Sequence, residues 1–399
     1  MLTPLEAERL IGEHLPCLPI ESLPLAQCAG GVLRENVYAE RDQPPFDRVA
    51  MDGIALDSAQ LQEGRRHWRV QAVQAAGDPP LTLASPGACI EVMTGAVLPA
   101  GCDAVVPVEQ LAIDAGEARL RANVTLQAWQ NVHRRGSDTR QGSLLLASGT
   151  RLSGPEVAIA AGAGMSRIRV ASQPRLVAIS TGSELVEPGE AILPHQVRRS
   201  NVYGIVAALR RHGFERVADD HIMDDEGELR SRLKFHLDTH DALILSGGVS
   251  MGRFDLVPKA LESLGVQVIF HKVEQRPGRP LWFGIAQAGP AVFALPGNPV
   301  STLVCLARYV IPALFAAMGA SAPPRERIPL SAAVSVSSSL AQFLPVRVEI
   351  DEWGRSWARP SPTNGSGDFT SLAGTEGFVE LPPGPNDYPK GFVTRLYRW

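Results

Sequence analysis

Cysteine is scarce in this sequence, and its spacing excludes the familiar cysteine-based frameworks. The 399 residues include five cysteines, which are Cys17, Cys28, Cys89, Cys102 and Cys305. Zinc sites need closely spaced pairs of the CxxC kind, and disulfide-stabilised folds need an even set in a short secreted chain. Neither pattern occurs here. An odd number of dispersed thiols is typical of a reducing compartment, which favours the cytoplasm.

An excess of positive charge is also absent. Lys and Arg number 38 against 42 Asp and Glu, and the net charge of −4 argues against general nucleic-acid binding. The residues from Met1 to Glu8 have neither the basic region nor the apolar core of a signal peptide. No apolar run in the sequence reads as long enough to cross a bilayer. We therefore expect a cytoplasmic protein that contacts neither nucleic acid nor membrane.

A catalytic nucleophile with its partners cannot be recognised either. No Ser-His-Asp or Cys-His arrangement is readable from the sequence. His271 adjoins Lys272, but it has no evident partner as a nucleophile or a base. We therefore expect chemistry that proceeds without a covalent enzyme intermediate.

The composition does provide for large apolar cores. Hydrophobic residues make up 45% of the chain and charged residues 20%, which is ordinary for a globular protein. From Pro174 onward strand and helix patterns alternate, which predicts an α/β domain with a mostly parallel sheet. Short strands separated by turns precede this domain and follow Pro324. They predict an inserted all-β module and a small C-terminal β-barrel.

Four domains follow from these patterns. Thr3, Pro4 and Glu6 predict a capped helix at the start of an arm with too few apolar residues to fold alone. We expect residues 1–44 and 145–172 to form one discontinuous linker or dimerisation domain, with residues 45–144 inserted as the β module. Residues 173–321 form the predicted α/β domain, and residues 322–399 the barrel.

One stretch of the α/β domain predicts an anion site. An apolar strand pattern from Leu243 breaks into Ser246-Gly247-Gly248, continues through Ser250 to Asp255, and is followed by a helix pattern. A glycine turn between strand and helix leaves backbone N–H groups free to hold a phosphate, and the serines add hydroxyl donors. The alternative interpretation is an ordinary tight turn of an α/β domain.

A second stretch repeats the pattern, and a pair of arginines lies between the two. Val292 begins another strand that leads into the turn Pro296-Gly297-Asn298-Pro299, where Pro299 suits a helix start. Arg276 and Arg279 lie three residues apart around a turn. In an open parallel sheet such turns line the crevice at the carboxyl ends of the strands. Together they predict a site for a phosphorylated, dianionic ligand.

Several loop carboxylates add a possible metal site. Each lies beside a strand end rather than on a charged helix face, and oxygen ligands from several loops are what Mg²⁺ with bound phosphate requires. The candidates are Asp52, Asp138, Glu184, Asp224 and Asp255. The alternative is that some of them only cap helices or turns, and for Asp52 a turn-stabilising role is a specific alternative.

These motifs resemble the molybdopterin molybdenumtransferase family, which includes MoeA and the gephyrin E domain. The resemblance extends over nearly the whole chain, with the motifs in a single order. They are Phe46-Asp-Arg-Val-Ala-Met-Asp-Gly53, Met93-Thr-Gly-Ala96, Leu98-Pro99, Ser180-Thr-Gly-Ser-Glu-Leu185, Asp224-Asp225, Ser246-Gly-Gly-Val-Ser250, Pro277-Gly-Arg-Pro280, Leu295-Pro-Gly-Asn-Pro-Val-Ser301, Asn364-Gly-Ser-Gly367 and Gly377-Phe-Val-Glu-Leu-Pro382.

The resemblance implies roles for individual residues. The active-site positions are Asp52, Thr94, Asp138, Glu184, Asp224 and Asp255, of which the last three would hold Mg²⁺. The substrate turns are Ser246, Gly247, Gly248 and Ser250, with Pro296, Gly297, Asn298 and Pro299. The molybdate candidates are Arg276, Arg279 and Ser301, with Arg347 and Ser366 from the C-terminal domain. For Arg347 a surface ion pair is the alternative.

Four positions depart from the family pattern. Ser183 stands where the family has an acid, and Ser137 where it usually has one. Their loss should weaken a divalent-metal site or leave its charge to Glu184, Asp224 and Asp255. Arg276 and Arg279 stand where the family usually has lysines. Arginine keeps the charge and adds bidentate donors, so oxyanion binding should survive with altered geometry.

The implied function is insertion of molybdate into adenylylated molybdopterin, with hydrolysis of the adenylate and release of AMP. The implied assembly is a homodimer whose active site takes residues from the β module of the opposite subunit. Expected partners are the small pterin substrate and, in the cell, an upstream adenylyltransferase and proteins that deliver the cofactor to molybdoenzymes. Two alternatives stay open: a molybdopterin adenylyltransferase, and a catalytically weak carrier or scaffold.

Overall fold

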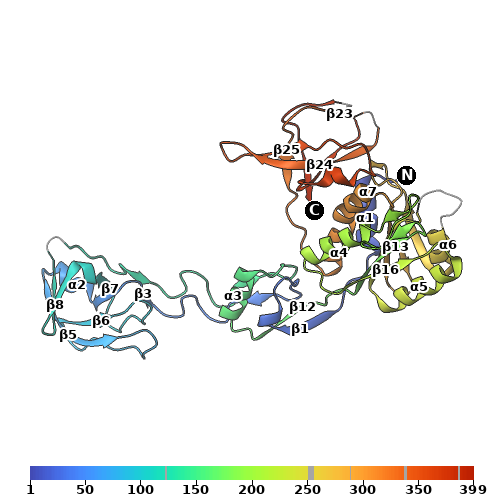
Figure 1. Cartoon of the computed structure of the whole chain (residues 1–399). Coiled ribbons are helices and arrows are strands. Elements are labelled where there is room, and N and C mark those ends of the chain that lie inside the picture. Colours follow the sequence, from blue (N-terminus) through green and yellow to red (C-terminus); the bar gives the residue numbers. More distant parts are fainter. Residues whose placement is uncertain (122–123, 250–255, 288, 337–338, 385–386) are drawn as a thin grey trace. The chain divides into compact units, whose positions relative to one another are not determined.

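The structure is a computed structural model that describes residues 1–121, 124–249, 256–287, 289–336, 339–384 and 387–399 (Figure 1). It divides into two compact units. Unit 1 comprises Met1–Glu35, Ser148–Ser153 and Arg167–Trp399, and unit 2 comprises Asn36–Ala147 and Gly154–Ser166. The chain thus leaves unit 1 and returns to it. Two predicted site residues, Ser250 and Asp255, lie outside the described residues.

Unit 1 is organised around a mixed six-stranded sheet. Its strands in spatial order are β16 (Val217–Ile222), β13 (Leu176–Thr181), β17 (Ala242–Ser246), β21 (Ala291–Leu295), β20 (Trp282–Ala286) and β18 (Val266–His271). The first four run parallel to one another, while β20 and β18 pair antiparallel. Strands β13, β17 and β21 are buried along their whole length, which explains their unbroken apolar sequences. The prediction of a mostly parallel sheet is confirmed.

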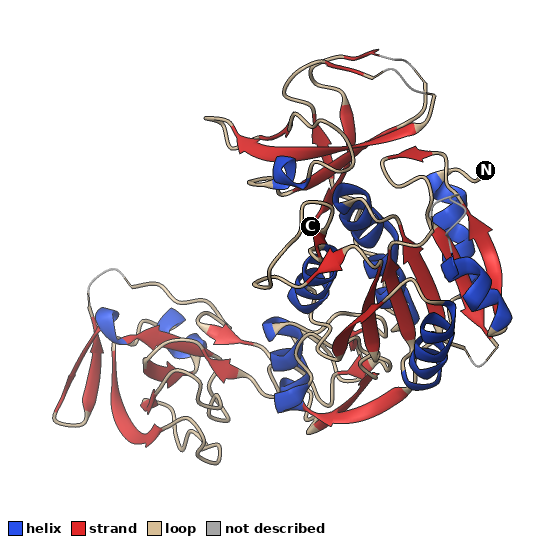
Figure 2. Ribbon diagram, turned by 45° about the vertical axis from the view of Figure 1, so that its right-hand side comes forward, coloured by secondary structure: helices blue, strands red, loops and turns tan. Residues whose placement is uncertain are grey.

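Helices cover both faces of this sheet (Figure 2). Alternate residues of β13 show the division, since Ala178 packs in one core and Val177 in the other. The first core includes α1 (Pro4–His14) and α4 (Asn201–Arg211), and the second includes α5 (Glu226–Thr239) and α6 (Leu256–Ser263). Helix α1 has the predicted capping box, in which Thr3 and Glu6 exchange hydrogen bonds.

A long helix follows β21 in three parts. These are α7 (Pro299–Cys305), a π-helical turn η3 (Leu306–Val310) and α8 (Ile311–Ala317). Together they are long and apolar enough to cross a membrane, so the expectation that no apolar run has this length was wrong. However, 72% of this apolar segment is buried inside the protein, which is typical of a core helix.

Two short pairings complete the α/β part of unit 1. Strand β1 (Ile20–Pro24) pairs along its whole length with β12 (Arg167–Ala171), and a 3₁₀ turn, η1 (Leu25–Gln27), follows β1. Strand β14 (Leu185–Val186) pairs in parallel with β15 (Val197–Arg198).

The C-terminal part of unit 1 is a small β structure, as predicted. Its strands are β22 (Arg327–Pro329), β23 (Val334–Ser335), β24 (Ala341–Ile350), β25 (Ser356–Pro360), β26 (Gly377–Leu381), β27 (Asp387–Tyr388) and β28 (Val393–Arg398), with a 3₁₀ turn η4 (Phe369–Leu372). The short strand β19 (Gln275–Arg276) comes from the α/β domain and pairs with β24. Arg276, the first of the predicted arginine pair, therefore lies in the C-terminal sheet.

Unit 2 is built on a six-stranded sheet of its own. In spatial order the strands are β7 (Ala104–Pro107), β4 (Gly53–Leu56), β6 (Ala88–Val92), β5 (His67–Gln74), β9 (Glu117–Leu120) and β8 (Leu111–Asp114). Smaller elements are β2 (Val37–Tyr38), β3 (Arg48–Val49), α2 (Ser58–Gln62), η2 (Val108–Gln110), β10 (Val132–His133), β11 (Leu144–Leu146) and α3 (Gly154–Gly162). Helix α2 was not predicted from the sequence.

Candidate functional site

Four parallel strands end at one edge of the unit 1 sheet. The register pairs Thr181 with Ile222 and pairs Ser246 with both Ser180 and Leu295. The loops that follow β13, β16, β17 and β21 therefore emerge side by side. These are the loops that carry the predicted glycine turn, the proline-flanked turn and two of the acids. The sheet thus brings four separate sequence motifs together at the edge where ligands bind in open α/β folds.

The glycine turn after β17 requires glycine for two reasons. Gly247 and Gly248 have φ values of +104° and +67°, a region that other residues adopt rarely. A Cβ at Gly247 would meet the Thr181 carbonyl oxygen at 2.8 Å, and one at Gly248 would meet Val257 Cγ2 at 2.5 Å. A Cβ at Gly297 would lie 3.6 Å from Gly247 Cα, so the two predicted substrate turns are neighbours.

Asn201 joins these two turns, and the sequence reading did not identify it as a site residue. Its Nδ2 donates to Ser246 Oγ at 2.8 Å and to the Gly297 carbonyl at 2.7 Å. It also lies 3.3 Å from Thr302 Oγ1. The sequence shows Ser200-Asn201 at a helix start, but only the distant partners distinguish Asn201 from an ordinary cap.

The proline-flanked turn is held from two directions. Thr302 Oγ1 donates to the Pro296 carbonyl at 2.6 Å, which closes the turn from inside α7. Asn298 Nδ2 donates to Ser366 Oγ at 2.8 Å, and the Val300 N–H donates to the Ser366 carbonyl at 3.1 Å. The predicted C-terminal residue Ser366 is therefore brought to the start of α7, beside the substrate turn.

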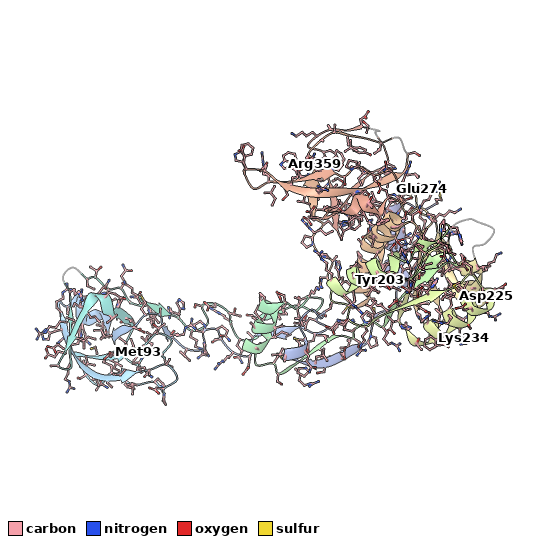
Figure 3. All side chains as sticks on the ribbon, in the orientation of Figure 1. Met93, Tyr203, Asp225, Lys234, Glu274 and Arg359 are labelled. Carbon is pink, nitrogen blue, oxygen red and sulfur yellow. The ribbon has the colours of Figure 1, made fainter. Side chains whose placement is uncertain are left out.

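Glu184 and Asp224 lie on adjacent loops at the same edge. Both are exposed, and no ion pair in the described part of the chain involves either carboxylate. The Ser183 N–H donates to Asp224 Oδ2 and Ser183 Oγ accepts from the Asp224 N–H, each at 3.2 Å. Ser183 thus fixes the neighbouring carboxylate. Figure 3 labels the next residue, Asp225, which caps α5.

These two acids do not form a complete metal site by themselves. Among the described residues, no group of three His, Cys, Asp or Glu side chains converges. The third predicted ligand, Asp255, lies outside that set. Two exposed carboxylates that form no ion pair with any described residue nevertheless suit a divalent ion in charge and in ligand type.

The arginine pair is exposed and has no carboxylate partner within the described ranges. Arg276 lies in β19, and Arg279 donates to Met1 Sδ at distances of 3.2 and 3.3 Å. Arg347, also exposed, donates to the Ala373 carbonyl at 3.2 Å. The surface ion pair suggested as an alternative for Arg347 is not among the ion pairs found in the described residues. Ser301 is 3% exposed in the first turn of α7.

In unit 2 the predicted residues Asp52 and Thr94 form a close pair. Asp52 Oδ1 accepts from the Thr94 N–H at 2.6 Å and from Thr94 Oγ1 at 2.7 Å. The backbone and then the hydroxyl hydrogen bond of Thr94 lower the pKa of the Asp52 carboxyl. Asp138 accepts from Ser137 Oγ at 3.2 Å. Ser137 and Ser183 therefore each bond to an acid predicted for the site.

Three regions of the chain match known families of domains. Residues 2–164 match the MoeA N-terminal region (domain I and II), and residues 177–316 match a probable molybdopterin binding domain. Residues 327–395 match the MoeA C-terminal region (domain IV). The molybdopterin molybdenumtransferase of a Synechocystis strain is 38% identical over 401 residues, covering 100% of each chain. That of Synechococcus elongatus is 36% identical over 387 residues, covering 94% of each.

The chain belongs to the molybdopterin molybdenumtransferase family. Two crystal structures of a molybdopterin biosynthesis MoeA protein from Pyrococcus horikoshii agree with this. Their TM-scores are 0.83 and 0.81 at 25% and 28% identity, and each covers 100% of this chain. The predicted family, multidomain fold and class of enzyme are thereby confirmed. The individual site residues and the domain boundaries stay predictions.

Proposed function

We propose that this enzyme inserts molybdate into adenylylated molybdopterin, with hydrolysis of the adenylate and release of AMP. The observation that carries the proposal is the convergence of four motif-bearing loops at the carboxyl edge of the unit 1 sheet. Asn201 ties the two substrate turns together, and Asn298 ties the second turn to Ser366. The relatives are named molybdopterin molybdenumtransferases, which supports molybdopterin and molybdenum as reactants. That the molybdopterin is adenylylated is our further proposal.

The two turns suit the phosphates of such a substrate. Gly247 and Gly248 let a ligand approach the backbone closely, and the start of α7 presents the positive end of a helix dipole beside the second turn. These fixed dipoles need no rearrangement when negative charge increases during adenylate hydrolysis. The pterin substrate is thus held by Ser246, Gly247 and Gly248 on one side and by the turn from Pro296 to Pro299 on the other.

Mg²⁺ fits the acidic side of the site. Glu184 and Asp224 would hold it with Asp255, since both described carboxylates are exposed and unneutralised by protein cations. When bound, a divalent ion neutralises phosphate charge and makes the phosphorus more susceptible to attack. The chain's own contribution is to hold these carboxylates in place, as Ser183 does for Asp224.

The exposed arginines suit molybdate, a tetrahedral dianion. Guanidinium groups bind oxyanions through paired N–H donors, and Arg276 and Arg279 have no carboxylate to compete with the anion within the described residues. Ser366 is bonded to Asn298 in the proline-flanked turn and adds a hydroxyl to the proposed group. Ser301, which is buried, and Arg347 complete the proposed molybdate group.

We further propose a homodimer, in which Asp52, Thr94 and Asp138 complete the active site of the partner subunit. Unit 2 exposes large apolar side chains that a partner would cover. Tyr38 is 51% exposed, Leu144 53% and Ile159 39%. The dispersed free thiols suit a reducing cytoplasm, where we place the enzyme.

The test is AMP release by the purified protein given adenylylated molybdopterin, Mg²⁺ and molybdate. We expect AMP to form only when molybdate is present, and Glu184→Gln to abolish its formation. ATP consumption with molybdopterin would instead identify an adenylyltransferase. Tight binding of the adenylate with no AMP formed would identify a carrier.

A further inference from the structure

The loop that carries the two exposed arginines rests on a buried polar side chain. Gln275 immediately precedes Arg276 in β19 and is 0% exposed. Its Oε1 accepts a hydrogen bond from the Tyr309 hydroxyl, and its Nε2 donates to the Pro277 carbonyl at 3.1 Å. Both ends of the amide are therefore paired inside the protein, and one of them holds the backbone between the two arginines.

Cys305 contacts the same loop. Its Sγ lies 3.6 Å from Gln275 Nε2 and 3.7 Å from the Gly278 carbonyl oxygen. A Cβ at Gly278 would meet both Cys305 Sγ and Gln275 Nε2 at 2.6 Å, and its φ of +93° also favours glycine. The backbone from Arg276 to Arg279 thus has a well-defined support in Gln275, Cys305 and Tyr309.

Tyr309 reaches Gln275 from the π-helical turn of the long core helix. Such turns insert an extra residue into a helix and are frequent at functional sites. The adjacent Arg308, 2% exposed, pairs with Glu8 at 2.9 Å and lies 3.4 Å from Glu380. Since these partners come from α1 and β26, the turn is fixed from two sides. Tyr309 has little freedom to move away from Gln275.

We propose that Tyr309, acting through Gln275, is a positioning residue for the oxyanion site of Arg276 and Arg279. This inference rests on the molybdate site of the proposed function. Neither buried side chain touches the anion, but their hydrogen bond fixes the loop from which both guanidinium groups extend. A buried amide oxygen that loses its partner must move or stay unpaired, and either outcome disturbs this loop.

Tyr309→Phe removes the hydroxyl and keeps the ring. Gln275 Oε1 then loses its donor, so the amide shifts and the arginine loop loses its defined geometry. We expect the KM for molybdate to rise about 10-fold, which corresponds to roughly 1.4 kcal/mol. The KM for adenylylated molybdopterin should change less than about twofold, because no hydrogen bond found within the described residues links this cluster to the glycine or proline turn.

The matched control is Tyr388→Phe. Tyr388 is 2% exposed, and its hydroxyl donates to the Pro382 carbonyl within the C-terminal domain. It loses a comparable buried hydrogen bond away from the arginine loop, so both KM values should stay at those of the unaltered enzyme. A general loss of stability would affect the two variants alike, and thermal unfolding of both measures that loss.

The measurement is AMP release by the full-length enzyme over a range of molybdate concentrations. A selective rise in the molybdate KM for Tyr309→Phe supports the proposal. Equal behaviour of the two tyrosine variants, or a parallel rise of both KM values, overturns it. If Tyr309→Phe does not fold, Cys305→Ala tests the same support and should raise the molybdate KM in the same selective way.

Arg276→Ala separates this inference from the site assignment beneath it. If Arg276→Ala leaves the molybdate KM unchanged, the proposed oxyanion site itself is wrong. If Arg276→Ala raises that KM and Tyr309→Phe does not, the oxyanion site stands and only the positioning role fails.

Discussion

The side-chain amide of Asn201 lies 2.8 Å from the hydroxyl of Ser246, at the point where β17 enters its glycine turn. The same amide nitrogen lies 2.7 Å from the Gly297 carbonyl, after β21. One side chain therefore bridges the ends of two neighbouring strands. Because Asn201 is the first residue of α4, this bridge also fixes the helix to the carboxyl edge of the sheet.

Replacing Asn201 should loosen both substrate turns. We expect Asn201→Ala to raise the KM for adenylylated molybdopterin about 10-fold and to lower the free energy of unfolding by about 1–2 kcal/mol, because two hydrogen bonds are lost. Steady-state kinetics and urea unfolding measure these effects. Asn201→Asp keeps the size but replaces the donating nitrogen by a carboxylate oxygen, so it should be worse than alanine. An unchanged KM in Asn201→Ala would contradict the bridging role.

The glycine turn should not tolerate a methyl group. Gly248→Ala introduces a Cβ 2.5 Å from Val257 Cγ2 at a φ of +67°, so we expect a loss of about 1 kcal/mol or more and a large loss of adenylate binding. Gly189→Ala is the matched control, since it has φ of +96° with nothing within 4 Å. It carries the backbone strain without the collision. Comparable adenylate affinity in both variants, measured by calorimetry, would show that the turn does not hold the substrate.

The pH dependence of the protein's folding stability should change when Thr94 is replaced. Hydrogen bonds from Thr94 lower the pKa of Asp52, so the carboxylate stays ionised below the ordinary value of 3.8. Stability from this pair is therefore present above that pH and is lost as the pH falls through the lowered pKa. In Thr94→Val the pKa should rise towards 3.8, and the acid side of the stability profile should move to higher pH. An unmoved profile in thermal unfolding between about pH 2 and pH 5 would refute this account.

The cysteines should differ sharply in reactivity. Burial raises the pKa of Cys89, Cys102 and Cys305 to about 12, so at pH 8 their thiolate fraction is on the order of 10⁻⁴. Cys17 is exposed. We expect iodoacetamide to modify Cys17 in the folded protein, and Cys89, Cys102 and Cys305 only after denaturation. Mass spectrometry of tryptic peptides measures this, and rapid labelling of Cys305 would show that the helix core opens.

Much of this protein could be predicted from its sequence, because local patterns carried the information. The capping box at Thr3 and Glu6, the apolar strand before Ser246 and the proline at the start of α7 each depend on residues close in the chain. The motifs that mark the family are also local, so the family and the fold class followed from them.

Other features depend on contacts between distant segments. The π-helical turn at Tyr309 is not readable from helix propensity, because its partners Gln275, Glu8 and Glu380 come from three other parts of the chain. The sequence predicted an ordinary strand-turn-helix unit where the long core helix lies. Whether such an apolar segment packs in a core depends on its burial, which the sequence does not give. Asn201 was not predicted as a site residue because its partners are 45 and 96 residues away in the sequence.

The sequence alone determined which chemical groups this protein has: glycine turns, a pair of arginines and loop carboxylates, each specified by short motifs. Only the tertiary structure decided which groups meet. Parallel strands carry their following loops to one edge regardless of separation along the chain, and the serine at position 183 acquired its bond to Asp224 through that arrangement. A motif depends on residues that are close in the sequence, whereas a site depends on distances between side chains that tertiary packing determines.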